Sequence, residues 1–182
     1  MSKTIGIITG SLRKNSFSGS IADYVKNNGP AGYTMKLIDI GGLPLYNQDS
    51  DGTDVKEYLD FRNEIKALDA VLFITPEHNR SIPAALKNAL DIGSRPYGQN
   101  VWNGKPGAVI SQSTGGIGGF GANHHLRQVL VFVNVLTLAQ PEAYIGASHT
   151  LIDHTGALSN EETKDFLNGF LAAFAEWIEK VA

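Results

Sequence analysis

Residues 5–18 read Ile5-Gly6-Ile7-Ile8-Thr9-Gly10-Ser11-Leu12-Arg13-Lys14-Asn15-Ser16-Phe17-Ser18, and this stretch decides the fold. Its apolar, branched start at residues 5–8 has the length of one buried strand. Its end opens a helix, because Phe17, Ile21 and Val25 recur at a spacing of four residues and mark one helical face. A strand that leads through a short loop into a helix is the repeating unit of an α/β fold.

The loop from Gly10 to Ser18 is suited to a phosphate group. Backbone N–H groups at a helix N-terminus are free, and the helix dipole makes that end positive. Ser11, Ser16 and Ser18 add hydroxyl donors. Arg13 adds a guanidinium whose planar fork matches phosphate oxygens. The alternative is an ordinary strand-to-helix turn whose serines only cap the helix, and the loop alone leaves both interpretations open.

The patterns that this loop lacks narrow the kind of phosphate. It has no G-x-x-x-x-G-K-[ST], the motif that holds a triphosphate with its magnesium. It also lacks the G-x-G-x-x-G of a dinucleotide fold. A terminal monophosphate fits the donors better, and flavin mononucleotide (FMN) is the candidate expected in a doubly wound fold.

Strands and helices alternate along the rest of the chain. Further apolar stretches predict strands at 35–40, 70–74, 106–111 and 135–138. Helical patterns are expected to begin near Asp54, Ser81 and His125, and a capping box of Ser159 and Glu162 precedes the last helix. This alternation predicts a five-stranded parallel sheet with helices on both faces. We expect one flavodoxin-like, three-layer domain over residues 1–182, with strand order 2-1-3-4-5.

Three loops should form one site in this fold. Ligands of such sheets lie beyond the carboxyl ends of the strands, where the strand order switches between strands 1 and 3. The loops that follow strands 1, 3 and 4 are 10–18, 75–80 and 113–121. The sequence therefore predicts a binding cleft between them.

A competing motif lies in the third loop. Gly116–Gly121 matches G-x-G-x-x-G and has Glu142 about twenty residues further on, as a Rossmann dinucleotide site requires. Pro141 makes a ribose-binding strand end doubtful, and a chain with 20 glycines matches this pattern easily by chance. The other interpretation is that these glycines let the backbone pass close to a flat ring. A Rossmann enzyme remains the weaker alternative.

Composition excludes several classes of protein. The chain has 182 residues, of which 42% are hydrophobic and 18% charged, as in globular proteins. A net charge of −3 gives no basic surface excess, so we expect no nucleic-acid partner. The absence of cysteine excludes disulfides, thiol catalysis and cysteine-ligated metals. His124 and His125 are adjacent and should point to different helix faces, so no metal site is expected.

The apolar stretches indicate no membrane partner. The longest, residues 129–139, is interrupted by Asn134 and Thr137 and is too short to span a bilayer. The first strand follows directly after Met1-Ser2-Lys3-Thr4, which leaves no room for a separate signal peptide. A cytoplasmic location is the resulting expectation.

Several motifs together resemble the NADPH-dependent FMN reductase family, in particular its soluble bacterial quinone, chromate and ferric reductase branch. The motifs are Gly10-Ser11-Leu12-Arg13, Thr75-Pro76-Glu77-His78-Asn79, Ser81-Ile82-Pro83, Leu86-Lys87-Asn88-Ala89-Leu90-Asp91, Ser94-Arg95-Pro96, Trp102-Asn103-Gly104-Lys105-Pro106, Gly115-Gly116 and His125-Leu126-Arg127-Gln128. They span most of the chain, and their spacing agrees with that of the family.

The resemblance implies non-covalent FMN, NAD(P)H as electron donor, and a homodimer or homotetramer. It assigns the ribityl phosphate to the first loop, namely to Ser11, Arg13, Ser16, Phe17 and Ser18. It assigns the isoalloxazine ring to the second loop, namely to Pro76, Glu77 and Asn79. His78 and, in the third loop, Ser113, Gly115 and Gly116 are further candidate cofactor-binding residues. His78 stands where the family has tyrosine, Thr114 where proline is common, and His124 where tyrosine precedes the histidine. These differences leave the preferred substrate open.

The implied activity is an oxidoreductase that passes hydride from NAD(P)H to FMN, and then electrons to quinones, chromate or ferric complexes. Donor and acceptor are expected to use one flavin face in turn, which predicts ping-pong kinetics. Arg95 is our candidate for orienting an anionic donor or acceptor, reaching across a subunit interface. Its alternative role is to interact with the last carbonyls of a helix. An electron carrier without NAD(P)H activity is the alternative function.

Overall fold

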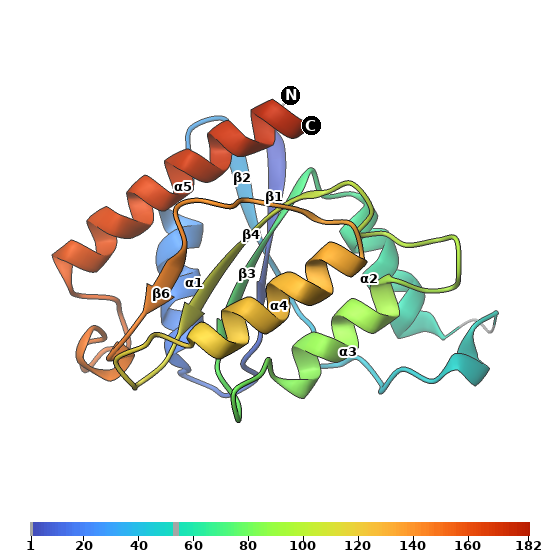
Figure 1. The fold of residues 1–182 in the computed structure, drawn as a ribbon, viewed down its shortest axis with the longest axis horizontal. Coiled ribbons are helices and arrows are strands. Elements are labelled where there is room, and N and C mark those ends of the chain that lie inside the picture. Colours follow the sequence, from blue (N-terminus) through green and yellow to red (C-terminus); the bar gives the residue numbers. More distant parts are fainter. Residues whose placement is uncertain (1, 53–54) are drawn as a thin grey trace.

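The computed structural model describes residues 2–52 and 55–182, which form a sheet flanked by helices (Figure 1). The strands are β1 (Lys3–Thr9), β2 (Tyr33–Ile38), β3 (Ala70–Pro76), β4 (Pro106–Gln112), β5 (Leu136–Thr137) and β6 (Ala143–Ile145). The α-helices are α1 (Phe17–Asn27), α2 (Lys56–Lys66), α3 (Ala84–Gly93), α4 (Phe120–Phe132) and α5 (Glu161–Val181). Two short 3₁₀ helices are η1 (Gln48–Ser50) and η2 (Ser148–Thr150).

All strand pairs are parallel, and the order is β2-β1-β3-β4-β5. This confirms the predicted flavodoxin-like order. Every residue of β3 and β4 is buried. Central strands of a parallel sheet are covered on both faces, which explains why these two stretches are apolar almost throughout.

The outer edge beside β4 is where the structure differs from the prediction. A single fifth strand was expected at 135–138, but two short strands share this position, and the sheet has six strands. β5 pairs with Pro106 and Gly107 at the start of β4, and β6 pairs with residues 110–112 at its end. Pairing with β4 ends at Leu138 and resumes at Ala143, and Pro141 in the interval has no N–H to donate to the ladder.

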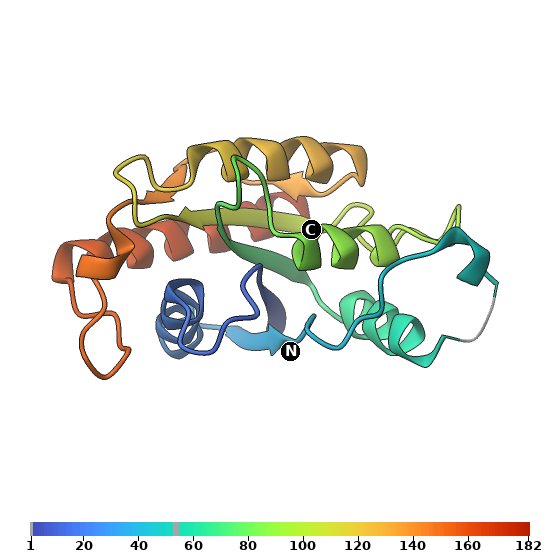
Figure 2. The ribbon, with the colours of Figure 1, turned by 90° about the horizontal axis from the view of Figure 1, so that it is seen from below.

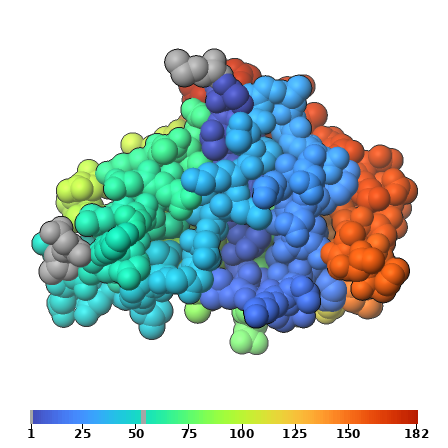
Figure 3. All heavy atoms as spheres, turned by 180° about the vertical axis from the view of Figure 1, so that it is seen from behind, coloured from blue at the N-terminus to red at the C-terminus, as the bar shows by residue number. Residues whose placement is uncertain are grey.

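The side chains of the sheet form a separate core on each face. Val71 and Phe73 point to the core built with α2, α3 and α4, while Leu72 and Ile74 point to the core built with α1 and α5. This alternation is the period-two geometry of a strand. Figure 2 shows α1 and α2 on opposite sides of the sheet, and Figure 3 shows α1 and β2 from behind, between α2 and the segment that leads into α5.

Helices α5 and α4 begin at positions other than the predicted ones. The cap of α5 is Asn160 and not Ser159, because the Thr163 N–H donates to Asn160 Oδ1 at 2.9 Å while Ser159 bonds Leu151 O. Helix α4 begins at Phe120, earlier than the expected His125. The start predicted at Asp54 lies outside the described residues, and α2 begins at Lys56. Among the described helices, none has the length and apolar character needed to cross a membrane.

Candidate functional site

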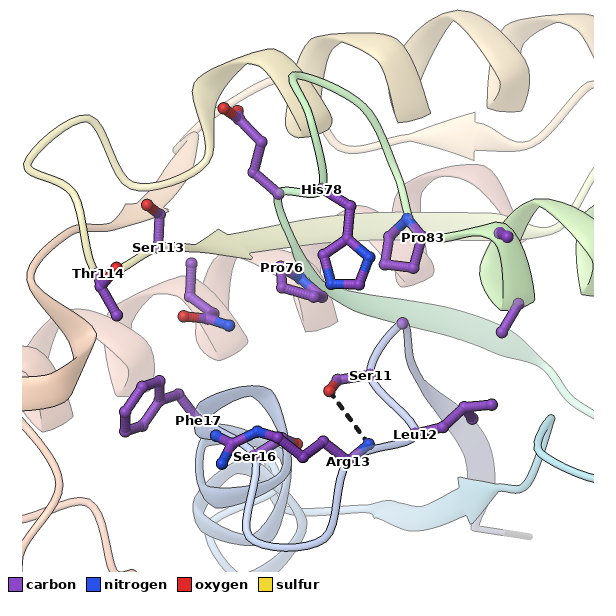
Figure 4. Close-up of a pocket in the computed structure, with 15 residues that line it drawn as sticks. Ser11, Leu12, Arg13, Ser16, Phe17, Pro76, His78, Pro83, Ser113 and Thr114 are labelled. Atoms are coloured by element: carbon purple, nitrogen blue, oxygen red, sulfur yellow. Dashed lines mark hydrogen bonds between the residues drawn. The ribbon is translucent and has the colours of Figure 1, made fainter.

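A cleft of about 580 Å³ lies at the carboxyl ends of β1, β3 and β4 (Figure 4). Its lining residues are Gly10, Ser11, Leu12, Arg13, Ser16, Phe17, Pro76, Glu77, His78, Pro83, Ala84, Ala85, Gln112, Ser113 and Thr114. Small-molecule sites typically enclose about 300–1,000 Å³, so the cleft has the size of a ligand site. The three loops expected to meet here do contribute to one cleft.

The N-terminus of α1 forms one end of the cleft. Ser16 caps the helix, because its Oγ accepts from the Gly19 N–H at 3.0 Å. The first helical hydrogen bond runs from Ser20 N to Ser16 O, so the N–H groups of Phe17 and Ser18 precede the intrahelical ladder. The first turn contains no acidic side chain. This end therefore keeps the positive potential that favours an anion.

Arg13 adds a full positive charge at the same end. Its guanidinium carbon lies 5.5 Å from the centroid of the Phe17 ring, and its backbone N–H donates weakly to Ser11 Oγ at 3.4 Å. Within residues 2–52 and 55–182, no carboxylate forms an ion pair with Arg13. Its charge is thus free to bind an anion in the cleft.

Gly10 lets the first loop pack against the third strand. Its N–H donates to Ile74 O at 2.9 Å, which continues the pairing of β1 with β3. A Cβ on Gly10 would lie 3.0 Å from Thr75 Oγ1 and 3.2 Å from Pro83 Cγ. Only glycine allows this close approach without a shift of its neighbours.

A tight hairpin at residues 77–81 forms the opposite wall. His78 and Ser81 exchange both backbone hydrogen bonds, at 2.9 and 3.0 Å. Asn79 and Arg80 between them both have positive φ, 52° and 67°, as a type I′ turn requires. Figure 4 shows Pro76, His78 and Pro83 on this side of the cleft and Ser11, Arg13 and Phe17 on the other. Rigid rings and backbone line this wall, which suits a flat ligand.

Glu77 holds this hairpin against α4. Its Oε2 accepts from the Ala122 N–H, in the first turn of α4, at 3.1 Å. The N-cap residue of α4 is Gly119, which has no side chain to cap the helix itself. The Glu77 Oε1 lies 3.4 Å from Arg80 Nη1. A second link joins Ser81 Oγ to His125 Nδ1 at 2.6 Å. The Glu77 carboxylate thus caps a helix and holds the hairpin, of which Glu77 and His78 line the cleft.

Several predicted site residues lie outside the cleft lining. Ser18 is fully buried, and its Oγ accepts from Gln112 Nε2 at 3.0 Å. Asn79 is exposed at the hairpin tip. Gly115 and Gly116 continue the loop beyond Thr114 without lining the cleft. Arg95 lies in a separate groove of about 520 Å³ with residues of α3 and α4, including Lys87 and His125.

The G-x-G-x-x-G segment has a structural explanation. Gly118 has φ of 61°, and a Cβ there would lie 2.5 Å from the carbonyl carbon of Tyr144. Gly119 has φ of 75° and forms the N-cap of α4. Glu142 precedes β6, whereas the ribose-binding acid of a dinucleotide site follows a strand. These glycines make the turn that leads into α4 and lies against Tyr144 of β6, so their presence is explained without a dinucleotide site.

Gln112 is one of several cleft residues that the sequence did not predict; others are Leu12, Pro83, Ala84 and Ala85. Gln112 ends β4 and is 5% exposed, and its Oε1 accepts from Ser148 Oγ at 2.7 Å. The sequence offers one indication of its role, a glutamine at the end of a mostly apolar strand. A buried amide needs hydrogen-bond partners, so such a residue is expected to have a specific contact. For metals, the described residues contain no group of three or more histidines or carboxylates able to hold an ion.

Comparisons with known proteins agree with this geometry. Residues 4–150 match the family model described as NADPH-dependent FMN reductase. A quinone reductase of Pseudomonas putida is 49% identical over 177 residues, covering 97% of this chain and 95% of the relative. A 2-hydroxy-1,4-benzoquinone reductase of a Burkholderia species is 42% identical, covering 98% and 97%. The structure of FerB, a flavoenzyme NAD(P)H:(acceptor) oxidoreductase of Paracoccus denitrificans, superposes with a TM-score of 0.91 at 41% identity, covering 98% of each chain.

Proposed function

Because the chain belongs to the NADPH-dependent FMN reductase family, and so is an FMN-dependent oxidoreductase that takes electrons from NAD(P)H, we propose that its cleft binds FMN and that it reduces quinones. The quinone assignment rests on the names of the relatives, of which two act on quinones. Chromate and ferric complexes are further proposed acceptors, from the resemblance alone.

The observation that carries this proposal is Arg13, which forms no ion pair with any described residue, beside the acid-free N-terminus of α1 within the cleft. We place the FMN phosphate there, with Ser11 and Ser16 as hydroxyl donors. Both serine Oγ atoms accept backbone N–H groups in the structure, so their hydroxyl hydrogens remain available for phosphate oxygens. Backbone N–H groups, serine hydroxyls and the Arg13 guanidinium would then donate to one phosphate.

At the other end, the hairpin 77–81 and Pro76 would hold the isoalloxazine ring. Bound FMN supplies the hydride and electron chemistry, while the protein supplies binding, orientation and exclusion of side reactions. The turn at Asn79 and Arg80 fixes the backbone of this wall, and the Glu77 carboxylate fixes the hairpin to α4. His78 lines the cleft and would contact the ring or an acceptor.

One open cleft supports the proposal that donor and acceptor bind in turn. Parallel lines in double-reciprocal plots of initial rates are expected, and intersecting lines would indicate a ternary complex. We further propose that Arg95 orients an anionic donor or acceptor of a neighbouring subunit, which requires a homodimer or homotetramer. A cytoplasmic location and a single domain over residues 1–182 remain expectations from the sequence.

The alternative function, an electron carrier, has less support. Carriers dock through charged faces, and a net charge of −3 over 182 residues is a weak basis for one. Aerobic oxidation of NAD(P)H by the purified, FMN-loaded protein with a quinone present separates the two functions. Turnover supports the reductase, whereas a yellow protein that leaves NAD(P)H unchanged with every acceptor would support the carrier.

The FMN site is tested by Arg13→Ala. Removal of a charge-assisted contact costs about 1.5–3 kcal/mol, which is roughly a ten- to hundredfold loss of FMN affinity. Riboflavin lacks the phosphate and should lose much less. Lys14→Ala is the control, since it removes a neighbouring exposed charge that does not line the cleft. Flavin titrations of the apoproteins measure both affinities, and unchanged FMN affinity in Arg13→Ala would contradict the assignment.

A further inference from the structure

We propose that Gln112 is an additional phosphate-binding residue, a neutral donor whose amide is oriented for the anion by Ser148 and Ser18. The inference rests on the proposed function, since it concerns the phosphate end of the same cleft. At the phosphate end of the cleft, the sequence predicted contacts from the first loop alone. Gln112 adds a contact from β4. It also gives a role to Ser148, which follows β6 and lies outside the cleft lining.

The Gln112 amide is held at both ends. Its Nε2 donates to Ser18 Oγ of α1 at 3.0 Å, and its Oε1 accepts from Ser148 Oγ of η2 at 2.7 Å. All three side chains are buried, with Ser18 and Ser148 at most 1% exposed. The amide therefore has one fixed position, and it joins three segments of the chain around the cleft.

The hydrogen bond from Ser148 determines which end of the Gln112 amide remains available to bind a ligand. An amide nitrogen carries two N–H donors, of which Ser18 takes one. Within the described part of the chain, the second N–H has no protein acceptor. The side chain lines the cleft together with Ser16 and Phe17, at the α1 end where the anion is proposed. Ser148 engages the oxygen, and the nitrogen is the end that can still donate to a ligand.

Ser148 itself is anchored to the rim of the cleft. Its backbone N–H donates to Ser113 O at 3.1 Å, and the Ser113 N–H donates to Ile145 O of β6 at 3.0 Å. The segment after β6 is thus fastened to the end of β4. This explains why Ser148 can orient Gln112 without lining the cleft, and why it is a positioning residue.

A neutral donor suits this position. Arg13 is exposed and contributes charge, whereas Gln112 lies at the floor of the cleft, where an unpaired charge would be costly to bury. Hydrogen bonds to a charged acceptor are stronger than those between neutral groups. Gln112 should therefore distinguish FMN from riboflavin, which presents no anion.

The test measures FMN and riboflavin affinities of apoprotein variants together with their thermal unfolding. Gln112→Met removes the donor and should weaken FMN binding about ten- to hundredfold and riboflavin binding less than threefold. Gln112→Glu replaces the donor by a carboxylate and should weaken FMN binding further. Ser148→Ala leaves the lining intact and should weaken FMN binding about three- to tenfold, because the amide loses its fixed orientation.

Ser20→Ala is the matched control. Ser20 is a buried serine of α1 whose Oγ donates to Ser16 O and does not contact Gln112. It should leave the ratio of FMN to riboflavin affinity unchanged. Equal losses for both flavins in the Gln112 and Ser148 variants, together with lower melting temperatures, would reduce Gln112 to a structural role and overturn the inference. Wild-type affinity for FMN in Gln112→Met would also overturn it, whereas wild-type protein that binds no FMN would instead overturn the proposed function.

Discussion

At the scale of the residue, the first loop depends on the one position where a side chain does not fit. Gly10 lies where β1 ends, between Thr75 and Pro83, and its own φ is not in the left-handed region. The requirement for glycine here is space and not backbone conformation. The end of β1 and the start of α3 therefore form one packed wall of the cleft.

Gly10→Ala should destabilise the protein by about 1–3 kcal/mol, since overpacking of a tight contact has that cost. The new methyl would lie 3.0 Å from Thr75 Oγ1 and 3.3 Å from Pro76 Cδ, so FMN affinity should also fall. Gly42→Ala is the control, because no atom lies within 4 Å of a Cβ there. Urea unfolding of the two variants measures the difference in stability. Equal midpoints would show that the neighbouring side chains accommodate the methyl group without loss of stability.

At the scale of the element, α4 is capped by a side chain from another part of the chain. The Glu77 carboxylate accepts from the Ala122 N–H, and the negative charge lies near the positive end of the helix dipole. The same carboxylate holds the hairpin that walls the cleft. Helix stability and cleft shape should therefore change together.

Glu77→Ala should cost about 0.5–2 kcal/mol of stability, the usual range for a lost cap, and weaken FMN binding as the hairpin loosens. Glu77→Gln keeps an oxygen acceptor and should retain most of both properties. Urea unfolding and FMN titration of the two variants provide the measurement. If Glu77→Ala changed stability but left FMN affinity intact, the hairpin would be positioned by the Ser81–His125 contact alone.

Comparison of these elements with the sequence shows what local patterns can predict. Alternating apolar stretches and helical periodicity predicted a parallel sheet with helices on both faces, and the flavodoxin-like order that suits this pattern is the one observed. Contiguous motifs placed Arg13 and Ser16 in the cleft. Gln112 was missed because its partners are 94 and 36 positions away, and no local pattern records such contacts. β6 was missed because three residues are too few for a periodic pattern.

At the scale of the whole molecule, a polar cluster ties the two ends of the chain together. Lys3 of β1 forms an ion pair with Glu179 of α5 at 2.8 Å, and Tyr33 of β2 donates to the same carboxylate at 2.6 Å. Burial, and then the hydrogen bond to Glu179, raise the pKa of Tyr33 to about 12. The last helix is thereby linked to the first two strands.

This cluster predicts a loss of stability at alkaline pH. Because the pKa of Tyr33 is raised in the folded protein, its contribution is complete below the ordinary value of 10.0 and is lost as pH rises towards about 12. Tyr33→Phe should reduce the slope of the unfolding free energy between these values. Tyr97→Phe, which changes a tyrosine that is 92% exposed, is the control. Denaturant unfolding at several pH values measures both slopes, and identical slopes for Tyr33→Phe and the wild type would contradict the prediction.

The divided strand at the β4 edge also bears on self-association into fibrils. A long, flat edge strand presents a row of unpaired backbone groups on which another chain can add a strand. Here that edge is broken into two residues of β5 and three of β6, with Pro141 between them, so no continuous template exists. The opposite edge, β2, carries Lys36, a charge of the kind that opposes strand addition. The border of the sheet beyond β4 is thus a poor template for amyloid growth.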